Sequence, residues 1–238
     1  MNFERIIAVR NFKTVYYDSG RAVKVFSHVF SDSDVLNEAL NQTRAMQTGI
    51  NVPKITDVSL SDGKQIIISE YIKGKSLDTV ISEDEYIKKL AKLHIEIHSK
   101  DAPLFPSLKD KLKRKIKGLS DDLSEKALKM ICELPNENRL CHGDFNPSNV
   151  ILGDDGKLYV LDWAHAAAGY PLFDAAQTYL LFKLRGNNDD AEKYLDEYCR
   201  ACGSEKEAVT KLIPLAAASS VSGSNEHDRN FFQSQIKF

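Results

Sequence analysis

The sequence predicts a fold of the α+β class, with a small antiparallel sheet first and a larger group of helices after it. Two observations predict it. About the first seventy residues consist mainly of short runs rich in β-branched and aromatic residues, separated by turns. After Gly74, apolar residues recur at helical spacing and capping residues mark helix starts. Strands collected in one part of a chain and helices in another are typical of α+β proteins.

The N-terminal part is expected to form five strands with one helix inserted after the third. The strands are predicted over residues 3–10, 14–18, 21–26, 58–60 and 65–70. The helix should run from Asp34 to Thr48, because Asp32 or Ser33 can cap it and Gly49 can stop it. Ser61–Lys64 is predicted as a four-residue hairpin loop containing glycine.

The rest of the chain is expected to be mainly helical. A capping box at Ser82–Glu85 starts a helix that continues to Ser99. Further helices are predicted over residues 107–117, 121–133, 171–184, 189–201, 205–219 and 225–236. Short apolar strands are predicted over 149–152 and 158–161. Because the texture changes at Tyr71–Lys75, the predicted domains are residues 1–72 and 73–238.

The composition excludes several classes of protein. The chain has 238 residues, with 32 basic against 34 acidic ones and a formal net charge of -2. No global field therefore draws it to nucleic acid or to an anionic membrane surface. No stretch of about 18 apolar residues could span a membrane, and residues 1–13 lack the pattern of a secretory signal. Since four cysteines are too few for a disulfide framework at this length, we expect a cytoplasmic protein.

Three patterns suggest a metal site or a charged partner but have simpler interpretations. Cys199 and Cys202 form a CxxC, yet no second matched pair accompanies them, so two positions on a helix face are favoured. His94 and His98 stand four apart without the HExxH order of zinc proteases. Six cations between residues 109 and 117 are interpreted as a solvated helix face.

The densest group of polar residues in an apolar setting lies at Cys141–Leu152. It contains Asp144 and Asn149, and Asp162 follows thirteen residues later, at the end of an apolar strand. Carboxylate and amide oxygens are hard ligands suited to Mg²⁺, which usually takes only one or two protein carboxylates and fills its shell with phosphate oxygens and water. A further Asp could orient a hydroxyl and accept its proton. The spacing therefore favours metal-assisted phosphoryl transfer, although Asp and Asn also cap turns.

These residues carry a resemblance to a known family. The pattern HGDxxxxN at His142–Asn149, followed by Leu161-Asp162-Trp163, resembles the catalytic and metal-binding segments of the aminoglycoside phosphotransferase and choline kinase-like family. Gly169–Asp174 resembles its GxPxxD stretch, in which the Asp is usually a structural anchor. The resemblance implies a two-lobed protein-kinase-like fold and a small-molecule kinase, with Asp144 as catalytic base and Asn149 and Asp162 as ligands of Mg²⁺.

The resemblance also implies a nucleotide site in the N-terminal part. Lys24, in an apolar third strand, is expected to contact the phosphates of ATP or GTP, and Glu38 on the following helix should pair with it. The segment that stands at the family's adenine-binding hinge consists of Ser69, Glu70, Tyr71 and Ile72. The simpler interpretations are a snorkelling strand lysine for Lys24 and a surface glutamate for Glu38.

One element departs from the family's pattern. The turn between the first two strands, Arg10–Thr14, has no glycine, so backbone N–H groups are not expected to clamp phosphates there as in a glycine-rich loop. Arg10 or Lys13 could supply charge instead. The expected function is transfer of the γ-phosphate to a hydroxyl of a small molecule, and no acceptor is selected by the sequence. The alternative is a catalytically weak pseudokinase that acts as a nucleotide-binding regulatory module.

Overall fold

The computed structural model describes residues 3–10, 12–79 and 83–238. The chain forms two compact units, each of which is built from two stretches of sequence. The first unit comprises Met1–Val80 and Ser148–His165, and the second comprises Ile81–Pro147 and Ala166–Phe238. The predicted division at residues 72 and 73 differs from this one, because the chain returns to the first unit after residue 147. The predicted cap at Ser82 lies outside the described residues.

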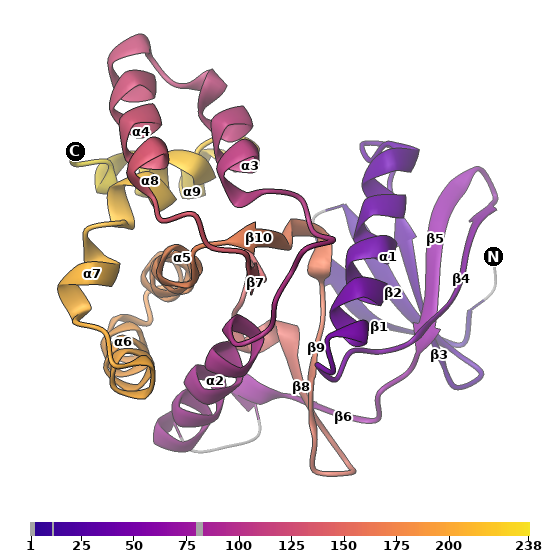
Figure 1. Cartoon of the computed structure of the whole chain (residues 1–238). Helices are drawn as coiled ribbons and strands as arrows, with labels where there is room; N and C mark the ends of the chain where they lie inside the picture. The colour runs from indigo at the N-terminus through magenta and orange to yellow at the C-terminus, as the bar shows by residue number, and fades with distance from the viewer. Residues whose placement is uncertain (1–2, 11, 80–82) are drawn as a thin grey trace. The chain divides into compact units, whose positions relative to one another are not determined.

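The first unit contains the five-stranded sheet that the sequence predicts (Figure 1). All neighbouring strands are antiparallel, in the order β1-β2-β3-β5-β4. Their bounds are β1 Arg5–Arg10, β2 Lys13–Asp18, β3 Arg21–Phe26, β4 Ile55–Ser61 and β5 Lys64–Glu70. The hairpin between β4 and β5 is tighter than predicted, since Ser61 pairs with Lys64 around a two-residue loop. Asp62 and Gly63 there have φ values of 48° and 72°, which matches the twist of the flanking strands.

A single helix, α1 (Asp32–Gln47), packs against β4 and β5. It starts two residues earlier than predicted because the hydroxyl of Ser31 accepts the N–H of Asp34, while the Asp34 carboxylate accepts the N–H of Ser31. Val35 and Ala39 on its inner face join Phe26 and Ile67 of the sheet in one core cluster. This packing fixes the face of α1 that points toward the third strand.

A second, three-stranded sheet completes the first unit. It consists of β6 (Gly74–Ser76), β8 (Val150–Gly153) and β9 (Leu158–Val160), in the order β6-β8-β9. The sequence predicts β8 and β9 but treats the residues of β6 as a joint. Three residues are too few to show an alternating pattern, and β6 becomes a strand because β8 offers it backbone partners. This sheet draws the segment around Asp162 into the first unit.

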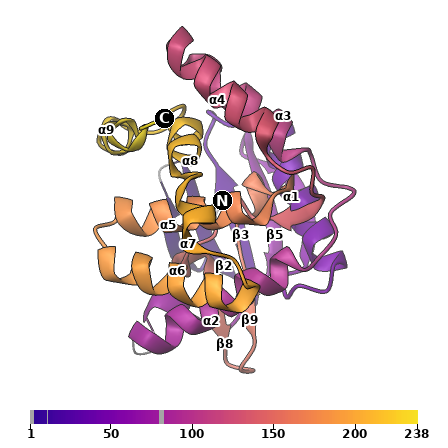
Figure 2. The same cartoon turned by 60° about the vertical axis from the view of Figure 1, so that its left-hand side comes forward.

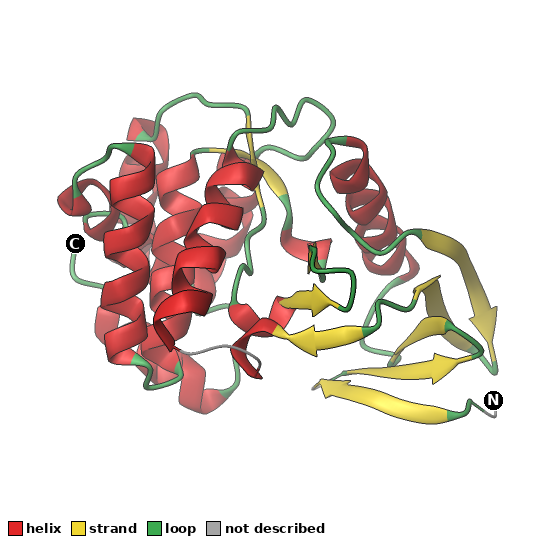
Figure 3. Ribbon diagram, turned by 90° about the horizontal axis from the view of Figure 1, so that it is seen from below, coloured by secondary structure: helices red, strands yellow, loops and turns green. Residues whose placement is uncertain are grey.

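The second unit is mainly helical, as predicted (Figures 2 and 3). Its helices are α2 Glu83–His98, α3 Leu108–Lys115, α4 Asp121–Glu133, α5 Pro171–Leu184, α6 Asn188–Cys202, α7 Lys206–Thr210, α8 Ile213–Ser220 and α9 Glu226–Gln235. Helix α6 packs against both α2 and α5, and α8 against α5. None of the helices in the described part of the chain is long and apolar enough to cross a membrane.

Two features of the second unit differ from the sequence prediction. The helix predicted over 205–219 is divided into α7 and α8, because Pro214 has no N–H and enters α8 in its first turn. A strand β10 (Ala167–Gly169) pairs antiparallel with β7 (Arg139–Cys141). The short β10 was not predicted, and it leads directly into α5, so it sets where Asp174 lies.

Candidate functional site

The first unit contains the predicted ion pair between Lys24 and Glu38. Lys24 lies in the middle of β3, paired with Val15 of β2 and Ile67 of β5. Its Nζ is 2.5 Å from Oε1 of Glu38, which projects from the inner face of α1 and is only 2% exposed. A buried carboxylate is costly unless it is paired and hydrogen-bonded. Glu38 on the inner face of α1 and Lys24 on the central strand therefore form a buried ion pair. The simpler interpretations, a lysine that extends to solvent and a glutamate on the surface, do not describe these residues.

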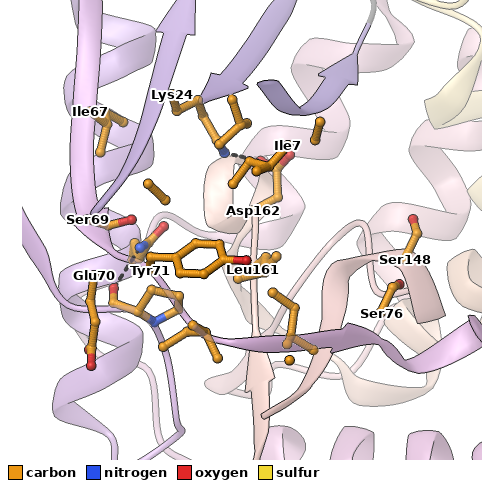
Figure 4. Close-up of a pocket in the computed structure, with 18 of the residues that line it drawn as sticks. Ile7, Lys24, Ile67, Ser69, Glu70, Tyr71, Ser76, Ser148, Leu161 and Asp162 are labelled. Carbon is orange, nitrogen blue, oxygen red and sulfur yellow. Dashed lines mark hydrogen bonds and ion pairs between the residues drawn. The ribbon is translucent and has the colours of Figure 1, made fainter. Parts of the chain in front are cut away.

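Asp162 belongs to the same group of charges. Its Oδ1 lies 3.7 Å from Nζ of Lys24, and Figure 4 shows the lysine pointing toward it. Asp162 has a φ of 61°, a left-handed backbone conformation that is uncommon for residues other than glycine. Such conformations persist where the surrounding structure imposes them, and they concentrate at functional sites. The carboxylate is thus aimed at Lys24 by a backbone that the fold constrains.

Asn149 and Asp162 lie at neighbouring ends of one hairpin. Asn149 directly precedes β8, and Asp162 follows β9. The two strands pair with each other, with Val150 of β8 opposite Val160 of β9. The N–H of Leu161 also donates to the carbonyl of Asn149 at 2.8 Å. One amide oxygen and one carboxylate are a donor set that fits Mg²⁺, which leaves its other positions to phosphate and water.

Two further residues belong to this surrounding: Lys13, which the sequence analysis named only as a charge that could replace the glycine-rich loop, and Asn41, which it did not single out. Lys13, at the start of β2, places Nζ 2.7 Å from Oε2 of Glu38 and 3.5 Å from Oδ1 of Asp162. Asn41 on α1 is fully buried and donates to the carbonyl of Trp163, which anchors the segment after Asp162. A polar residue on the inner face of an amphipathic helix is the only signal for Asn41. We call Lys13, Lys24, Glu38 and Asp162 the lysine–carboxylate cluster.

Three members of this cluster, Lys24, Glu38 and Asp162, line a pocket of about 330 Å³ in the first unit (Figure 4), and Lys13, which pairs with Glu38, lies outside the lining. The predicted hinge residues Ser69, Glu70, Tyr71 and Ile72 line it. Its apolar lining is formed by Ile7, Ala8, Val15, Ala22, Pro53, Ile67, Ile151 and Leu161. The pocket therefore combines apolar walls with charges from Lys24, Glu38 and Asp162, the usual composition of a small-molecule site.

In the second unit, the loop around Asp144 is fixed by hydrogen bonds on each side. The N–H of Asp144 donates to Nδ1 of His142, and the side-chain amide of Asn146 donates to the carbonyl of Asp144. The hydroxyl of Thr178 donates to the carbonyl of Phe145, whose ring is fully buried. Hydrogen bonds on both sides therefore hold the backbone of Asp144 in place.

The same loop is anchored to α5 through Asp174. The backbone N–H groups of His142 and Gly143 donate to the two carboxylate oxygens of Asp174, at 2.6 and 2.8 Å. His94 and His98 of α2 each place Nε2 at 3.1 Å from Oδ2 of the same residue. Burial alone would raise the pKa of Asp174, but the hydrogen bonds from the two histidines hold it well below its usual range. Asp174 thus anchors the loop at His142 and Gly143, as its resemblance to the Asp of the GxPxxD stretch implies.

One potential metal-ligating atom each of His94, His98 and Asp174 lies within 4.8 Å of the other two, so the three side chains could in principle hold a metal ion. Their hydrogen bonds favour a different interpretation. The Nδ1 atoms of the two histidines lie 2.7 and 2.8 Å from the hydroxyls of Tyr194 and Tyr198 on α6. Both ring nitrogens of each histidine are therefore used within a buried network, in which Nε2–H donates to the carboxylate and Nδ1 accepts from tyrosine. Burial, followed by the nearby His98, lowers the pKa of His94 to about 3, which is consistent with a neutral ring.

The lysine run on α3 is only partly a solvated face. Lys113, Arg114 and Lys117 are exposed, whereas Lys111 and Lys115 are half-buried. Burial, and then the charges of Lys115 and Arg114, lower the pKa of Lys111 to about 8. Burial also lowers the pKa of Lys115, and attraction to Asp144 opposes that effect. The inner side of α3 thus brings positive charge toward the loop that carries Asp144.

The CxxC pair has the character of structural cysteines. Cys199 is buried on α6 and Cys202 is exposed, and both are free thiols. Burial, and then the neighbouring Cys202, raise the pKa of Cys199 to about 11. Since the thiolate is the nucleophile and the metal ligand, a raised pKa disfavours both roles.

Comparisons with known proteins agree with the resemblance inferred from the motifs. The sequence model of the "Phosphotransferase enzyme family" matches residues 9–212. No curated protein matches the chain. Among solved structures, a thermostable mutant of aminoglycoside phosphotransferase APH(4)-Ia, in complex with AMP-PNP and hygromycin B, is 17% identical, with a TM-score of 0.72 over 97% of this chain and 90% of that one.

Choline kinases have the same fold. Choline kinase LicA from Streptococcus pneumoniae is 18% identical, with a TM-score of 0.70 over 99% of this chain and 92% of that one. A choline/ethanolamine kinase family protein from Mesorhizobium loti is 14% identical, with a TM-score of 0.66 over 99% and 86%. The predicted α+β, protein-kinase-like fold is therefore confirmed.

Proposed function

The chain belongs to the phosphotransferase enzyme family and is a small-molecule kinase, and from this premise we propose that it transfers the γ-phosphate of ATP or GTP to a hydroxyl group. The observation that carries the proposal is the lysine–carboxylate cluster beside the apolar pocket of the first unit. An apolar pocket suits a nucleobase, and a cation next to it suits phosphates. One structural neighbour was solved with AMP-PNP and another with ADP, which supports a nucleotide in this pocket.

The nucleotide would be held at its two ends by different residues. Ser69, Glu70, Tyr71 and Ile72 would border the base, since they line the pocket where β5 ends. Lys24 would contact the α and β phosphates, and Glu38 would keep its ammonium group in place. Lysine is a compact point charge that attracts phosphate without dictating bidentate geometry. The ion pair to Glu38 is therefore what would give Lys24 its direction.

Asn149 and Asp162 would hold Mg²⁺, as their donor types and neighbouring positions on the β8–β9 hairpin allow. The metal ion, when bound, neutralises charge on the phosphate oxygens. The constrained backbone of Asp162, with its φ of 61°, would direct its carboxylate toward the metal ion. Both residues would thus act as oxygen donors, and neither would exchange a proton with the acceptor.

Asp144 would orient the acceptor hydroxyl and accept its proton. Proton transfer by a positioned carboxylate requires a fixed side chain, and the loop of Asp144 is tied to Asp174 through His142 and Gly143. Little covalent chemistry falls to the protein in phosphoryl transfer, so most of the acceleration would come from positioning and charge neutralisation. Rigidity of this loop is therefore central to the proposal.

The first experiment measures binding of ATP and GTP with and without Mg²⁺, followed by nucleotide turnover with a panel of hydroxyl acceptors. The panel includes hygromycin B, because one structural neighbour was solved in complex with it. It also includes choline, because another neighbour is a choline kinase. We expect Mg²⁺-dependent binding and acceptor-dependent turnover. Binding without turnover on any acceptor would instead favour the regulatory pseudokinase, and absence of nucleotide binding would contradict both.

Replacing the proposed base tests its role directly. Asp144→Asn should lower kcat by about 10²- to 10⁴-fold, the usual contribution of a positioned general base. Nucleotide affinity should stay unchanged, since Asp144 is proposed to contact the acceptor hydroxyl and not the nucleotide. Asp122→Asn serves as the matched control, because Asp122 is an exposed residue of α4 in the same unit. A variant at Asp144 with the rate of the unmodified enzyme would refute the assignment.

A further inference from the structure

The segment between β1 and β2 contains no glycine, so a group other than a glycine-rich backbone has to contact the phosphates there. We propose that Lys13, the first residue of β2, is a second phosphate-binding lysine of the nucleotide site, beside Lys24. The proposal rests on the proposed function, because it assumes that the pocket of the first unit takes a nucleotide. Its evidence is the position of Lys13 relative to the lysine–carboxylate cluster.

The two lysines converge on the same two carboxylates. Glu38 receives one lysine on each oxygen, Lys13 at 2.7 Å and Lys24 at 2.5 Å. Both ammonium groups also approach Oδ1 of Asp162, at 3.5 and 3.7 Å. Because they share this one oxygen, the two positive charges lie at most about 7 Å apart. Lys13 therefore reaches the same point as Lys24, although it comes from a different strand.

The burial of Lys13 is unusual for a lysine. Its side chain is 14% exposed, less than the 20% of Lys24. Its Nζ also lies 5.3 and 5.1 Å from the ring centroids of Phe26 and Phe30, within the range of cation–π contacts. Lysines are rarely withdrawn from water unless they are paired. The surroundings thus hold the ammonium group of Lys13 at the cluster and away from solvent.

The charges of the cluster indicate what the second lysine is for. Among the four described residues of the cluster, two cations face two carboxylates, so their formal charges balance. If Asp162 contributes its charge to a magnesium ion, the two positive charges of Lys13 and Lys24 exceed the single negative charge of Glu38 within the cluster, and the difference favours phosphate oxygens. The ammonium group of Lys13 has three N–H donors, of which the hydrogen bond to Glu38 uses one. Two lysines in this position can then stabilise the phosphates in place of the backbone N–H groups of a glycine-rich loop.

The alternative is that Lys13 only ties β2 to α1. If Lys13 were purely structural, its replacement would lower the stability of the first unit. It would then change the affinities for a nucleotide and for its nucleoside by the same factor. The two roles can therefore be separated by comparing ligands that share a base and differ in phosphates.

The experiment measures dissociation constants of adenosine, ADP and ATP with Mg²⁺ by calorimetry, or of the guanosine series if the enzyme prefers GTP. The variants are Lys13→Met, Lys24→Met and the control Lys64→Met, an exposed lysine at the start of β5. Loss of a hydrogen bond to a charged group should weaken ATP binding to Lys13→Met by about tenfold to a hundredfold. Adenosine should bind Lys13→Met as it binds the unmodified protein, and Lys13→Arg should retain most of the ATP affinity.

Several results would overturn the proposal. Equal ATP affinity for Lys13→Met and the unmodified protein would show that Lys13 does not contact phosphate, and an equal loss for adenosine and ATP would show general damage to the pocket. If Lys13→Met does not fold, Lys13→Gln takes its place, since its amide can still donate to Glu38. If the unmodified protein binds neither ATP nor GTP, the proposed function fails together with this inference. Binding by the unmodified protein with no effect at Lys13 removes this inference alone.

Discussion

At the scale of single residues, His94 shows how a polar side chain can be buried without charge. It is fully buried between the hydroxyl of Tyr194 and the carboxylate of Asp174. His98, one helical turn later, repeats the arrangement with Tyr198. A neutral His94 ring can donate Nε2–H to the ionised carboxylate and accept from the tyrosine hydroxyl, whereas a second proton on this ring would place an additional charge in the core.

This arrangement predicts a loss of stability in mild acid. The pKa of His94 is lowered by burial from 6.5 to about 3, so below pH 6.5 the unfolded chain binds a proton that the folded chain does not. The free energy of unfolding should therefore fall as the pH drops from about 6.5, by up to roughly 1.4 kcal/mol per pH unit. Since Asp174 has a pKa well below its usual range, its own contribution is lost only at lower pH.

Urea unfolding between pH 7.5 and 4.5 measures this dependence. His94→Gln should be less stable at pH 7.5 because its packing is lost, yet its stability should depend less steeply on pH. His227→Gln, at an exposed position of α9, should keep the slope of the unmodified protein. An unaltered slope in His94→Gln would show that another group titrates.

At the scale of elements, the short strand β6 connects the pocket with the β8–β9 hairpin. Gly74 and Ser76 of β6 line the pocket, and the strand pairs with β8 from Gly74 opposite Gly153 to Ser76 opposite Ile151. A Cβ on Gly74 would overlap the carbonyl oxygen of Leu152 and lie 2.8 Å from Cα of Gly153. Both neighbours are backbone atoms that cannot rotate away, so this strand pair requires glycine.

Gly74→Ala should therefore destabilise the first unit by about 1 to 3 kcal/mol, the usual cost of overpacking. It should also weaken nucleotide binding, because β6 forms part of the pocket. Gly118→Ala is the matched control, since a Cβ there meets no heavy atom within 4 Å, and a change within about 0.5 kcal/mol is expected. Urea midpoints and nucleotide affinity check both variants, and equal midpoints would contradict the close approach of β6 to β8.

At the scale of the whole molecule, stability depends on packing and not on covalent cross-links. All four cysteines are free, with Cys132 and Cys202 exposed and Cys141 and Cys199 buried. Burial raises the pKa of the Cys141 thiol well above its usual range and that of Cys199 to about 11. The two compact units therefore have to be stabilised by their own cores and hydrogen-bond networks.

A thiol titration tests this state. Two thiols should react rapidly with a chromogenic disulfide reagent in the folded protein, and all four should react in urea, because burial and a raised pKa both slow the reaction. Cys132→Ser and Cys202→Ser should each remove one rapid thiol. The thermal midpoint should be the same with and without reductant. A disulfide between Cys199 and Cys202 would instead lower the thiol count, and reductant would then lower the midpoint.

Much of the molecule is determined by local patterns in the sequence. Alternation and turn residues predict the strands of the large sheet, and capping residues with helical spacing predict most helices. The spacing of Asp144, Asn149 and Asp162 identifies the family that the comparisons confirm. These features are readable because each depends on residues close together in the chain. Errors arose where a local rule competed with another, as at Pro214, which divides a continuous helical pattern into α7 and α8.

Only the tertiary structure decided the features that join distant segments. Lys13 meets Glu38 across twenty-five positions, and Asn41 meets Trp163 across more than one hundred. The strands β6 and β10, of three residues each, exist because β8 and β7 offer them backbone partners. Such contacts leave no periodic trace in the sequence, because any polar residue with the right reach could make them. The sequence by itself therefore determined the family and the residues proposed for its chemistry, while the fold decided which charges surround them.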